Sequence, residues 1–325
     1  MTKFIRRLQR IGSSILVSLP KDWVEANKLD KSNEVELETN ENTISITVNK
    51  AERPSKEVVI SYPLPTDENI VADITGAYLL GYDVIRIKAK TTIPVEDREK
   101  IRNSMRRLVG MEIVEEDSSN INVQFLLDAT TLNPAKILKR ISSIALGMFN
   151  DLSLALISDD KSNIQTLSNR DDEVDRQYFL LVRLIRSTMI DSRLASTFRL
   201  ENIDVLDYRM AANILETASD TLVEIANSVS NTTLSKSDLK KIYDITKDIE
   251  TIHQKSIDAF IDQDRRLAIE AIAGHRKFQK KISDIRSSIE EKNQLQIDLL
   301  DLIYMFERVS RSWADIADLV KPVYS

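Results

Sequence analysis

The chain has 325 residues, of which 42% are hydrophobic and 30% are charged, so it is too apolar to be disordered and long enough for two or three domains. It contains no cysteine, which excludes disulfides, thiolate metal sites, iron–sulfur clusters and cysteine nucleophiles. It also has no signal peptide and no run of about 18 uncharged apolar residues, so we expect a cytoplasmic protein without membrane insertion.

The net charge of −6 is unevenly distributed. Residues 1–21 contain five basic residues and no acidic one, which gives +5 and leaves −11 for the rest of the chain. Binding to nucleic acid depends on the charge of one face rather than on the total charge. Charge alone is consistent with two interpretations of this segment, a solvated basic end and a surface that binds a polyanion.

The pattern of residues 1–50 predicts the order strand, strand, helix, strand, strand. A basic segment precedes an apolar run over 14–19 that ends at Pro20, and residues 21–29 have helical spacing. Strict alternation of apolar and polar residues over 34–38 and 43–48 predicts a hairpin with one solvent-exposed face. Because so short a unit buries too little surface to be stable alone, we expect it to oligomerise or dock.

An ordered series of motifs runs through this segment. The sequence FIRRLQRIGSSILVSLPKDWV over 4–24, followed by Leu29 and by Asn33-Glu34-Val35, has a basic strand, a Gly-Ser turn, an apolar strand ending in Leu-Pro, a helix and a hairpin. It resembles the AbrB/SpoVT family of DNA-binding domains. Ser32-Asn33 replaces the family's usual Gly-Asp, and asparagine tolerates positive φ. The resemblance implies a β-barrel made by two chains that swap their hairpins, with first-strand arginines on DNA.

The basic residues of this segment are the candidate DNA contacts. Three arginines lie too close together to share one strand face with Phe4 and Leu8, so some project into solvent. A guanidinium can pair bidentately with a guanine edge or a phosphate, whereas lysine acts as a point charge. The two serines of the turn either bond phosphate or only shape the turn. The predicted DNA-binding residues are Lys3, Arg6, Arg7, Arg10, Ser13, Ser14 and Lys21.

Residues 51–130 predict a small α/β unit of order β-α-β-α-β-β. Helices are expected over 69–80 and 94–108, each ended by a glycine, Gly81 and Gly110. The unit has no Gly-rich loop that would cradle a phosphate, so we interpret it as a connector or dimerisation unit. The expected strands cover 58–60, 82–87, 111–114 and 121–126.

The remainder of the chain is predicted to be all helix. Residues 135–321 contain no proline and only two glycines, the residues that destabilise helix interiors most. Heptad spacing in the last segment favours nearly parallel packing, and six segments suit a pair of elongated three-helix bundles. The expected helices cover 134–158, 160–190, 203–230, 235–261, 264–291 and 294–320.

Short motifs on the first three of these helices carry a second resemblance. They are Leu138-Lys139-Arg140-Ile141 with Met148 and Asp151, the run DDEVDR over 171–176, and Glu216 with Asp220. With two repeats of three helices, they resemble the PhoU family in its archaeal form, which carries a fused AbrB-like domain. The resemblance implies an α+β chain of three domains: 1–50 binding DNA, 51–130 connecting, and 131–325 PhoU-like.

PhoU proteins often hold metal ions on an acidic-xxx-Asp motif. Asp171 and Asp175 are one helical turn apart, as are Glu216 and Asp220, so each pair projects from one face. Such oxygen ligands suit a divalent metal or iron in the first bundle. Asp171 also falls on an apolar seam, where an unpaired carboxylate is costly, so we expect something to neutralise it.

Ordinary interactions of these carboxylates stay open as the alternative. In this alternative the carboxylates pair with Arg140, Arg183 or Arg209, or are simply solvated. The second bundle has basic residues where carboxylates would be needed, so we expect no second metal cluster. Its two histidines, His253 and His275, are expected to be surface or helix-packing residues.

The combined interpretation is a homodimeric, or higher homo-oligomeric, transcriptional regulator of phosphate uptake. It binds DNA through the N-terminal domain, and its helical domain receives a signal or a phosphate-transport or signalling partner. An enzyme is excluded first, since two histidines and no cysteine cannot supply a nucleophile, a base and an oxyanion donor. The alternative is an adaptor for a phosphate transporter or sensor kinase, in which the N-terminal domain serves only to dimerise. A third interpretation is direct sensing of metal or phosphate by the first bundle.

Overall fold

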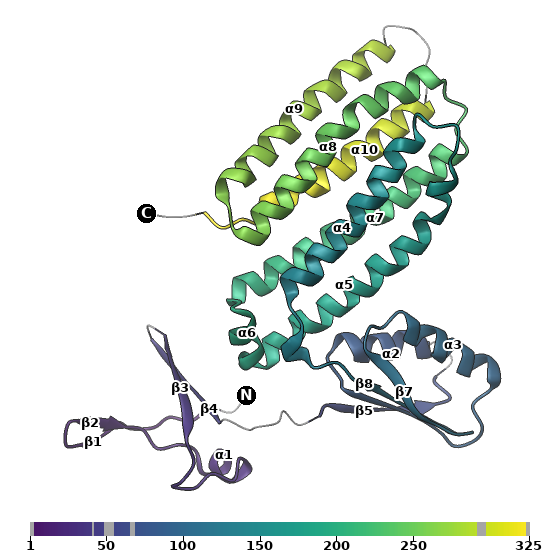
Figure 1. Cartoon of the computed structure of the whole chain (residues 1–325). Coiled ribbons are helices and arrows are strands. Elements are labelled where there is room, and N and C mark those ends of the chain that lie inside the picture. Colours follow the sequence, from purple (N-terminus) through teal and green to yellow (C-terminus); the bar gives the residue numbers. More distant parts are fainter. Residues whose placement is uncertain (1–2, 41, 49–54, 66–68, 291–296, 323–325) are drawn as a thin grey trace. The chain divides into compact units, whose positions relative to one another are not determined.

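The structure is a computed structural model that describes residues 3–40, 42–48, 55–65, 69–290 and 297–322 (Figure 1). The chain separates into two compact units, Met1–Pro54 and Ser55–Ser325. The first boundary lies close to the one expected at residue 50. The second unit contains both the α/β elements and the long helices, so their division into two domains at residue 130 stays a prediction.

The first unit has the predicted order of elements. Its strands β1 (Gln9–Ile11) and β2 (Ser14–Leu16) form an antiparallel hairpin, helix α1 covers Lys21–Ala26, and β3 (Val35–Asn40) pairs with β4 (Thr43–Val48). Gly12, at φ 63°, makes the β1–β2 turn, a conformation that suits glycine. Within one chain these are two separate two-stranded sheets, so the swapped barrel stays a prediction for the oligomer.

The α/β elements of the second unit also follow the prediction. Strands β5 (Glu57–Tyr62), β6 (Val84–Ala89), β7 (Met111–Glu116) and β8 (Asn120–Phe125) form one sheet of order β5-β6-β8-β7. Only β5 and β6 are parallel, because helix α2 (Ile70–Leu79) crosses over between them. Helix α3 (Val95–Arg106) leads from β6 to β7. Both helices lie on the same side of the sheet in Figure 1.

Six long helices make up most of the remaining chain, as predicted. In addition, 3-10 turns cover Ala129–Thr131 and Ser162–Thr166. The helices are α4 (Pro134–Ala155), α5 (Leu167–Ile190), α7 (Asn202–Ser230), α8 (Lys236–Asp262), α9 (Arg265–Glu290) and α10 (Ile297–Ala317), with a short α6 (Ser192–Phe198) between α5 and α7.

Two details of the helical prediction are wrong. The second helix begins at Leu167 rather than at residue 160, because the Asp160 side chain accepts a hydrogen bond from the Ser162 backbone N–H and holds a turn there. The sequence pattern also predicts no helix between residues 190 and 203, where α6 lies. The Asp191 side chain starts this helix by accepting from the Arg193 N–H, and Arg199 ends it at φ 56°.

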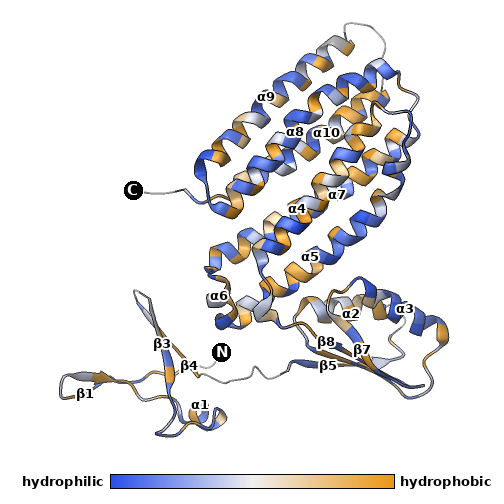
Figure 2. Ribbon diagram, viewed as in Figure 1, coloured by the Kyte–Doolittle hydropathy of each residue, from blue (hydrophilic) through white to orange (hydrophobic). Residues whose placement is uncertain are grey.

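The two groups of three helices share one hydrophobic core. α4, α5 and α7 pack together, as do α8, α9 and α10, and the groups meet through α7 against α10 and α4 against α8. Figure 2 shows apolar and polar residues on different faces of these helices. None of the described helices is both long and apolar enough to cross a membrane.

A buried histidine lies in this shared core. His253 Nε2 is 2.8 Å from Ser142 Oγ, and the imidazole packs edge-on against Trp313 with 4.1 Å between ring centroids. Full burial lowers the pKa of His253 to about 3, so the ring is neutral at physiological pH. His253 is therefore a helix-packing residue, as the sequence predicted.

Candidate functional site

The basic residues at the start of the chain are exposed. Lys3, Arg6, Arg7 and Arg10 have no acidic partner anywhere in the residues that the structure describes. Arg6 makes only a cation–π contact, with its Cζ 5.5 Å from the centroid of the Phe4 ring. These four side chains are therefore available to an outside anion.

The remaining predicted DNA contacts lie on or after the β1–β2 hairpin. Ser13 and Ser14 are exposed at its turn, and Arg10 lies opposite Ile15 in the strand register. Lys21 begins α1 and forms an ion pair of 3.5 Å with Glu25, but both side chains are largely exposed. Such a surface ion pair contributes little to stability, so a DNA phosphate can replace Glu25 as the partner of Lys21.

Apolar side chains of the same unit are also exposed. Ile5 is 95% exposed, Leu8 71%, Ile11 63% and Ile15 66%. No described residue of Met1–Pro54 is buried. So many large apolar side chains exposed in one small unit are typical of a domain that another chain covers.

Four carboxylates of the first bundle influence one another strongly. Burial is the main cause that raises the pKa of Asp171, from an ordinary 3.8 to about 7, followed by the charges of Asp220, Asp175 and Glu216. Burial and like charges also raise the pKa values of Glu216 and Asp220. The structure thus brings together the four residues that the two acidic pairs supply.

None of the arginines expected as alternative partners pairs with Asp171. Arg140 forms an ion pair of 2.7 Å with Glu173, and Arg183 one of 3.0 Å with Asp83. Arg209 stacks on a tyrosine ring, with its Cζ 5.0 Å from the centroid. Asp171 Oδ1 is buried and has no hydrogen-bond partner.

Asp175, the fourth of these carboxylates, has a partner that the sequence did not indicate. Arg107, which follows α3, forms an ion pair of 2.6 Å with Asp175. The described residues contain no group of three or more His, Asp or Glu side chains placed to hold a metal ion. Asp171, whose pKa is raised to about 7, suits proton binding, and metal binding by the four carboxylates stays a prediction. Elemental analysis of the purified protein against an Asp171→Ala, Asp175→Ala variant tests the metal prediction.

The proton on Asp171 makes stability depend on pH. Since its folded pKa lies above its ordinary value, ionisation in the folded state lowers the free energy of unfolding as the pH rises from about 4 through 7. Asp171→Asn is expected to raise that free energy by about 1–2 kcal/mol at pH 8, a value reduced because solvent screens this partly exposed group. Urea unfolding should show a smaller gain at pH 5. Asp284→Asn, at an exposed residue of α9 that has no partner among the described residues, is the control, and equal gains at both pH values would contradict the assignment.

A buried arginine, Arg183, joins α5 to the α/β elements, whereas the sequence suggested it only as a partner of the bundle's carboxylates. Arg183 Nη1 donates to the carbonyl oxygens of Tyr78 and Tyr82, both at 2.8 Å. Its Nη2 donates to Asp83 Oδ1 at 3.0 Å, and its Cζ lies 3.9 Å from the centroid of the Phe125 ring. The signal for it was a single charge within the apolar run 179–185, FLLVRLI.

Comparison with known proteins gives matches in two parts of the chain. Residues 138–229 match the family model of the PhoU domain, and residues 8–56 match that of MazE, a bacterial antitoxin described as an antidote-toxin recognition family. No curated protein matches the chain.

Two solved structures resemble part of the fold. The phosphate transport system regulatory protein PhoU from Streptococcus pneumoniae is 18% identical, with a TM-score of 0.47, and the match covers 57% of this chain and 91% of that one. PhoU from Pseudomonas aeruginosa is 15% identical, with a TM-score of 0.42, and the match covers 57% and 93%. By its family matches, the chain combines an N-terminal domain of the MazE and AbrB-like type with a C-terminal PhoU domain.

Proposed function

We propose that the protein is a cytoplasmic, DNA-binding transcriptional regulator of phosphate uptake rather than an enzyme. The observation that carries the proposal is that Arg6, Arg7 and Arg10, on a domain of MazE type, have no acidic partner among the described residues. The PhoU domain supports the phosphate part of the proposal and supplies a body that can receive a signal. The predicted contacts to DNA are the seven residues given above.

The same N-terminal domain would make the protein a dimer or a higher oligomer. Its apolar residues are exposed in a single chain, and a second copy of the domain would cover them. Two-fold pairing would also present two clusters of arginines to DNA, which doubles the local positive charge.

The dependence of DNA binding on salt tests the proposal. Each phosphate that a cation neutralises releases counterions, so a regulator with about five to eight phosphate contacts should lose affinity by roughly 10³- to 10⁴-fold between 50 and 200 mM salt. Binding of fragments of the organism's own genome, measured by fluorescence anisotropy across that range, gives the slope. Feeble binding with a flat slope would contradict DNA binding.

An adaptor is the second candidate, and one surface favours it. Ile203, Leu206 and Met210 lie on one face of α7 and are 48%, 53% and 45% exposed. Such a face suits docking on a transporter or sensor kinase. An adaptor would show the flat salt slope and would keep its partner when the N-terminal arginines are removed.

A further inference from the structure

The four-stranded sheet has two edges, and their sequences differ in character. β5 pairs only with β6, and β7 pairs only with β8 (Figure 1). Three of the six residues of β7 are glutamates, and its register is irregular between Ile113 and Glu115. β5 has the sequence EVVISY, with one glutamate and a regular register. Charges and bulges commonly protect edge strands from pairing with another chain, so β7 is protected in this way and β5 is not.

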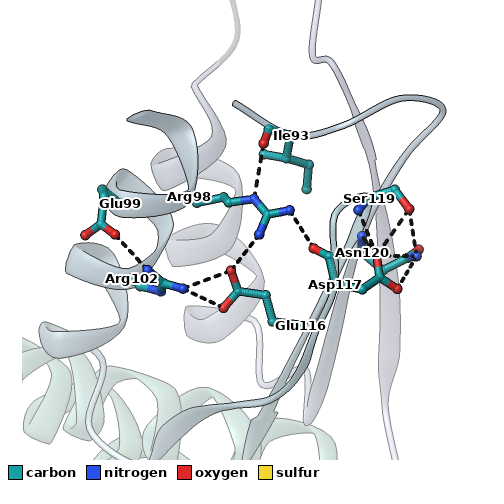
Figure 3. A network of polar contacts seen from close by, with 8 residues as sticks. All are labelled: Ile93, Arg98, Glu99, Arg102, Glu116, Asp117, Ser119 and Asn120. Carbon is teal, nitrogen blue, oxygen red and sulfur yellow. Dashed lines mark hydrogen bonds and ion pairs between the residues drawn. The ribbon is translucent and has the colours of Figure 1, made fainter. Parts of the chain in front are cut away.

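Charged side chains also tie the β7 edge to α3 (Figure 3). Arg98 and Arg102 both bond the Glu116 carboxylate, at 3.2 and 3.1 Å, and Arg98 Nη2 donates to the Asp117 carbonyl at 2.6 Å. These contacts hold the end of β7 in place. A second β7 would bring its own glutamates against those of the first, and like charges directly opposite each other destabilise a pair of strands.

Alternate residues of β5 present their backbone groups to the edge of the sheet. Lys56 faces β6, because its N–H donates to Asp83 Oδ2 at 2.9 Å and its carbonyl accepts from the Val84 N–H at 3.1 Å. Successive residues of a strand direct their backbone groups to opposite sides, so every second residue after Lys56 faces β6 and the others offer a donor and an acceptor to one more strand. The residues that point away from β6 are Glu57, Val59 and Ser61.

An antiparallel pair of β5 strands centred on Val59 would satisfy all of these groups. Val59 would lie opposite Val59 of a second copy, and Glu57 opposite Ser61, and each such pair exchanges two hydrogen bonds. On the face of the sheet that the helices cover, Val58 of each copy would lie opposite Ile60 of the other. Both residues are β-branched, and cross-strand pairs of apolar side chains stabilise neighbouring strands. The β5 edge is therefore complementary to itself.

The charges beside this edge are complementary in the same register. Glu57 is bound within its own chain by Arg86, at 2.5 Å from Nε and 3.1 Å from Nη2. In the pair it would lie opposite Ser61 of the second copy, which adjoins the exposed Lys88 of that copy in the register of β5 and β6. The two copies of Glu57 would be about 14 Å apart along the strands, so like charges do not meet.

We propose that β5 pairs with β5 of a second copy of this chain, antiparallel about Val59, and joins the two sheets into one continuous sheet. This interface is separate from the one proposed for the N-terminal domain. Residues 49–54 join that domain to the unit that contains β5, so a dimer formed by either interface raises the effective concentration for the other. The proposal does not depend on DNA binding, and a protein that fails to bind DNA would leave it standing.

Cysteine cross-linking tests the register, because the chain has no cysteine of its own. In the full chain, Val59→Cys would place two thiols across the two-fold axis, where the Cα atoms of a hydrogen-bonded pair are about 5.5 Å apart. A short bismaleimide should then link most chains into dimers. Val114→Cys is the matched control, since Val114 lies in β7 and is 50% exposed, against 49% for Val59. It should be linked at least fivefold less, and equal linking of the two variants would overturn the proposal.

A lysine at the same position tests the strength of the pairing. Val59→Lys would set two ammonium groups opposite each other, whereas a single chain should tolerate this half-exposed position and keep its helicity by circular dichroism. The dimer dissociation constant, measured by sedimentation, should rise at least tenfold and stay unchanged for Val114→Lys. Hydrogen exchange of residues 57–61 should be faster in Val59→Lys than in the unchanged chain. Equal dissociation constants for the two lysine variants, or equal exchange with and without Val59→Lys, would contradict strand pairing.

Discussion

Replacing both Arg6 and Arg10 by alanine is expected to weaken DNA binding by about 100-fold or more. In a dimer the change removes four guanidinium groups, and each good bidentate contact to a base contributes about 1–3 kcal/mol, where 1.4 kcal/mol is a factor of ten. Neither arginine has an acidic partner among the described residues, so the fold should not respond. Gel retardation gives the affinity, and circular dichroism should show unchanged helicity.

A variant with the same loss of charge elsewhere is the control for this experiment. Arg265 and Arg276 are exposed on α9, and neither has a partner in the described part of the chain. Replacing both by alanine should leave DNA binding within about twofold, because neither residue belongs to the unit Met1–Pro54 that carries the predicted DNA contacts. Full binding by the Arg6→Ala, Arg10→Ala variant would remove these arginines from the interface.

Most of the fold could be predicted because local patterns agree with the tertiary structure. The scarcity of proline and glycine after residue 134 indicated the long helices, and Gly81 and Gly110 marked the ends of α2 and α3. Both glycines have positive φ, 76° and 82°, and a Cβ at Gly110 would lie 2.8 Å from Leu127. These positions therefore need glycine for reasons that the chain shows locally.

The candidate sites could be predicted only in part. Helical spacing placed Asp171 on an apolar seam, and its raised pKa follows from that burial. Which residue pairs with each carboxylate could not be predicted. An arginine side chain can reach across several helical turns, and its partner depends on how the helices and strands pack. Arg107, which follows α3 and is far away in sequence, pairs with Asp175, and it was not among the arginines expected as partners. The strand order β5-β6-β8-β7 could not be predicted either, since periodicity does not specify which strands are neighbours.

Replacing Arg183 by methionine is expected to lower the free energy of unfolding by about 3–5 kcal/mol. Methionine keeps much of the volume but removes the donors to two backbone carbonyls, and partly buried Asp83 loses its ion pair with Arg183. Arg183 is only 4% exposed, so water cannot readily replace it. Urea unfolding at pH 7 measures the loss, and hydrogen exchange should speed up in the α2–β6 turn, residues 80–83.

One turn further along the same face of α5, Arg186 provides the matched control. It makes a single long hydrogen bond of 3.4 Å, from Nη1 to the Leu79 carbonyl, and is only half-buried. Arg186→Met should therefore cost less than about 1 kcal/mol. Arg183→Lys should recover part of the loss, because an ammonium keeps the charge beside Asp83 but cannot span both carbonyls. Equal destabilisation by the two methionine variants would show that Arg183 does not clamp α5 to the α/β elements.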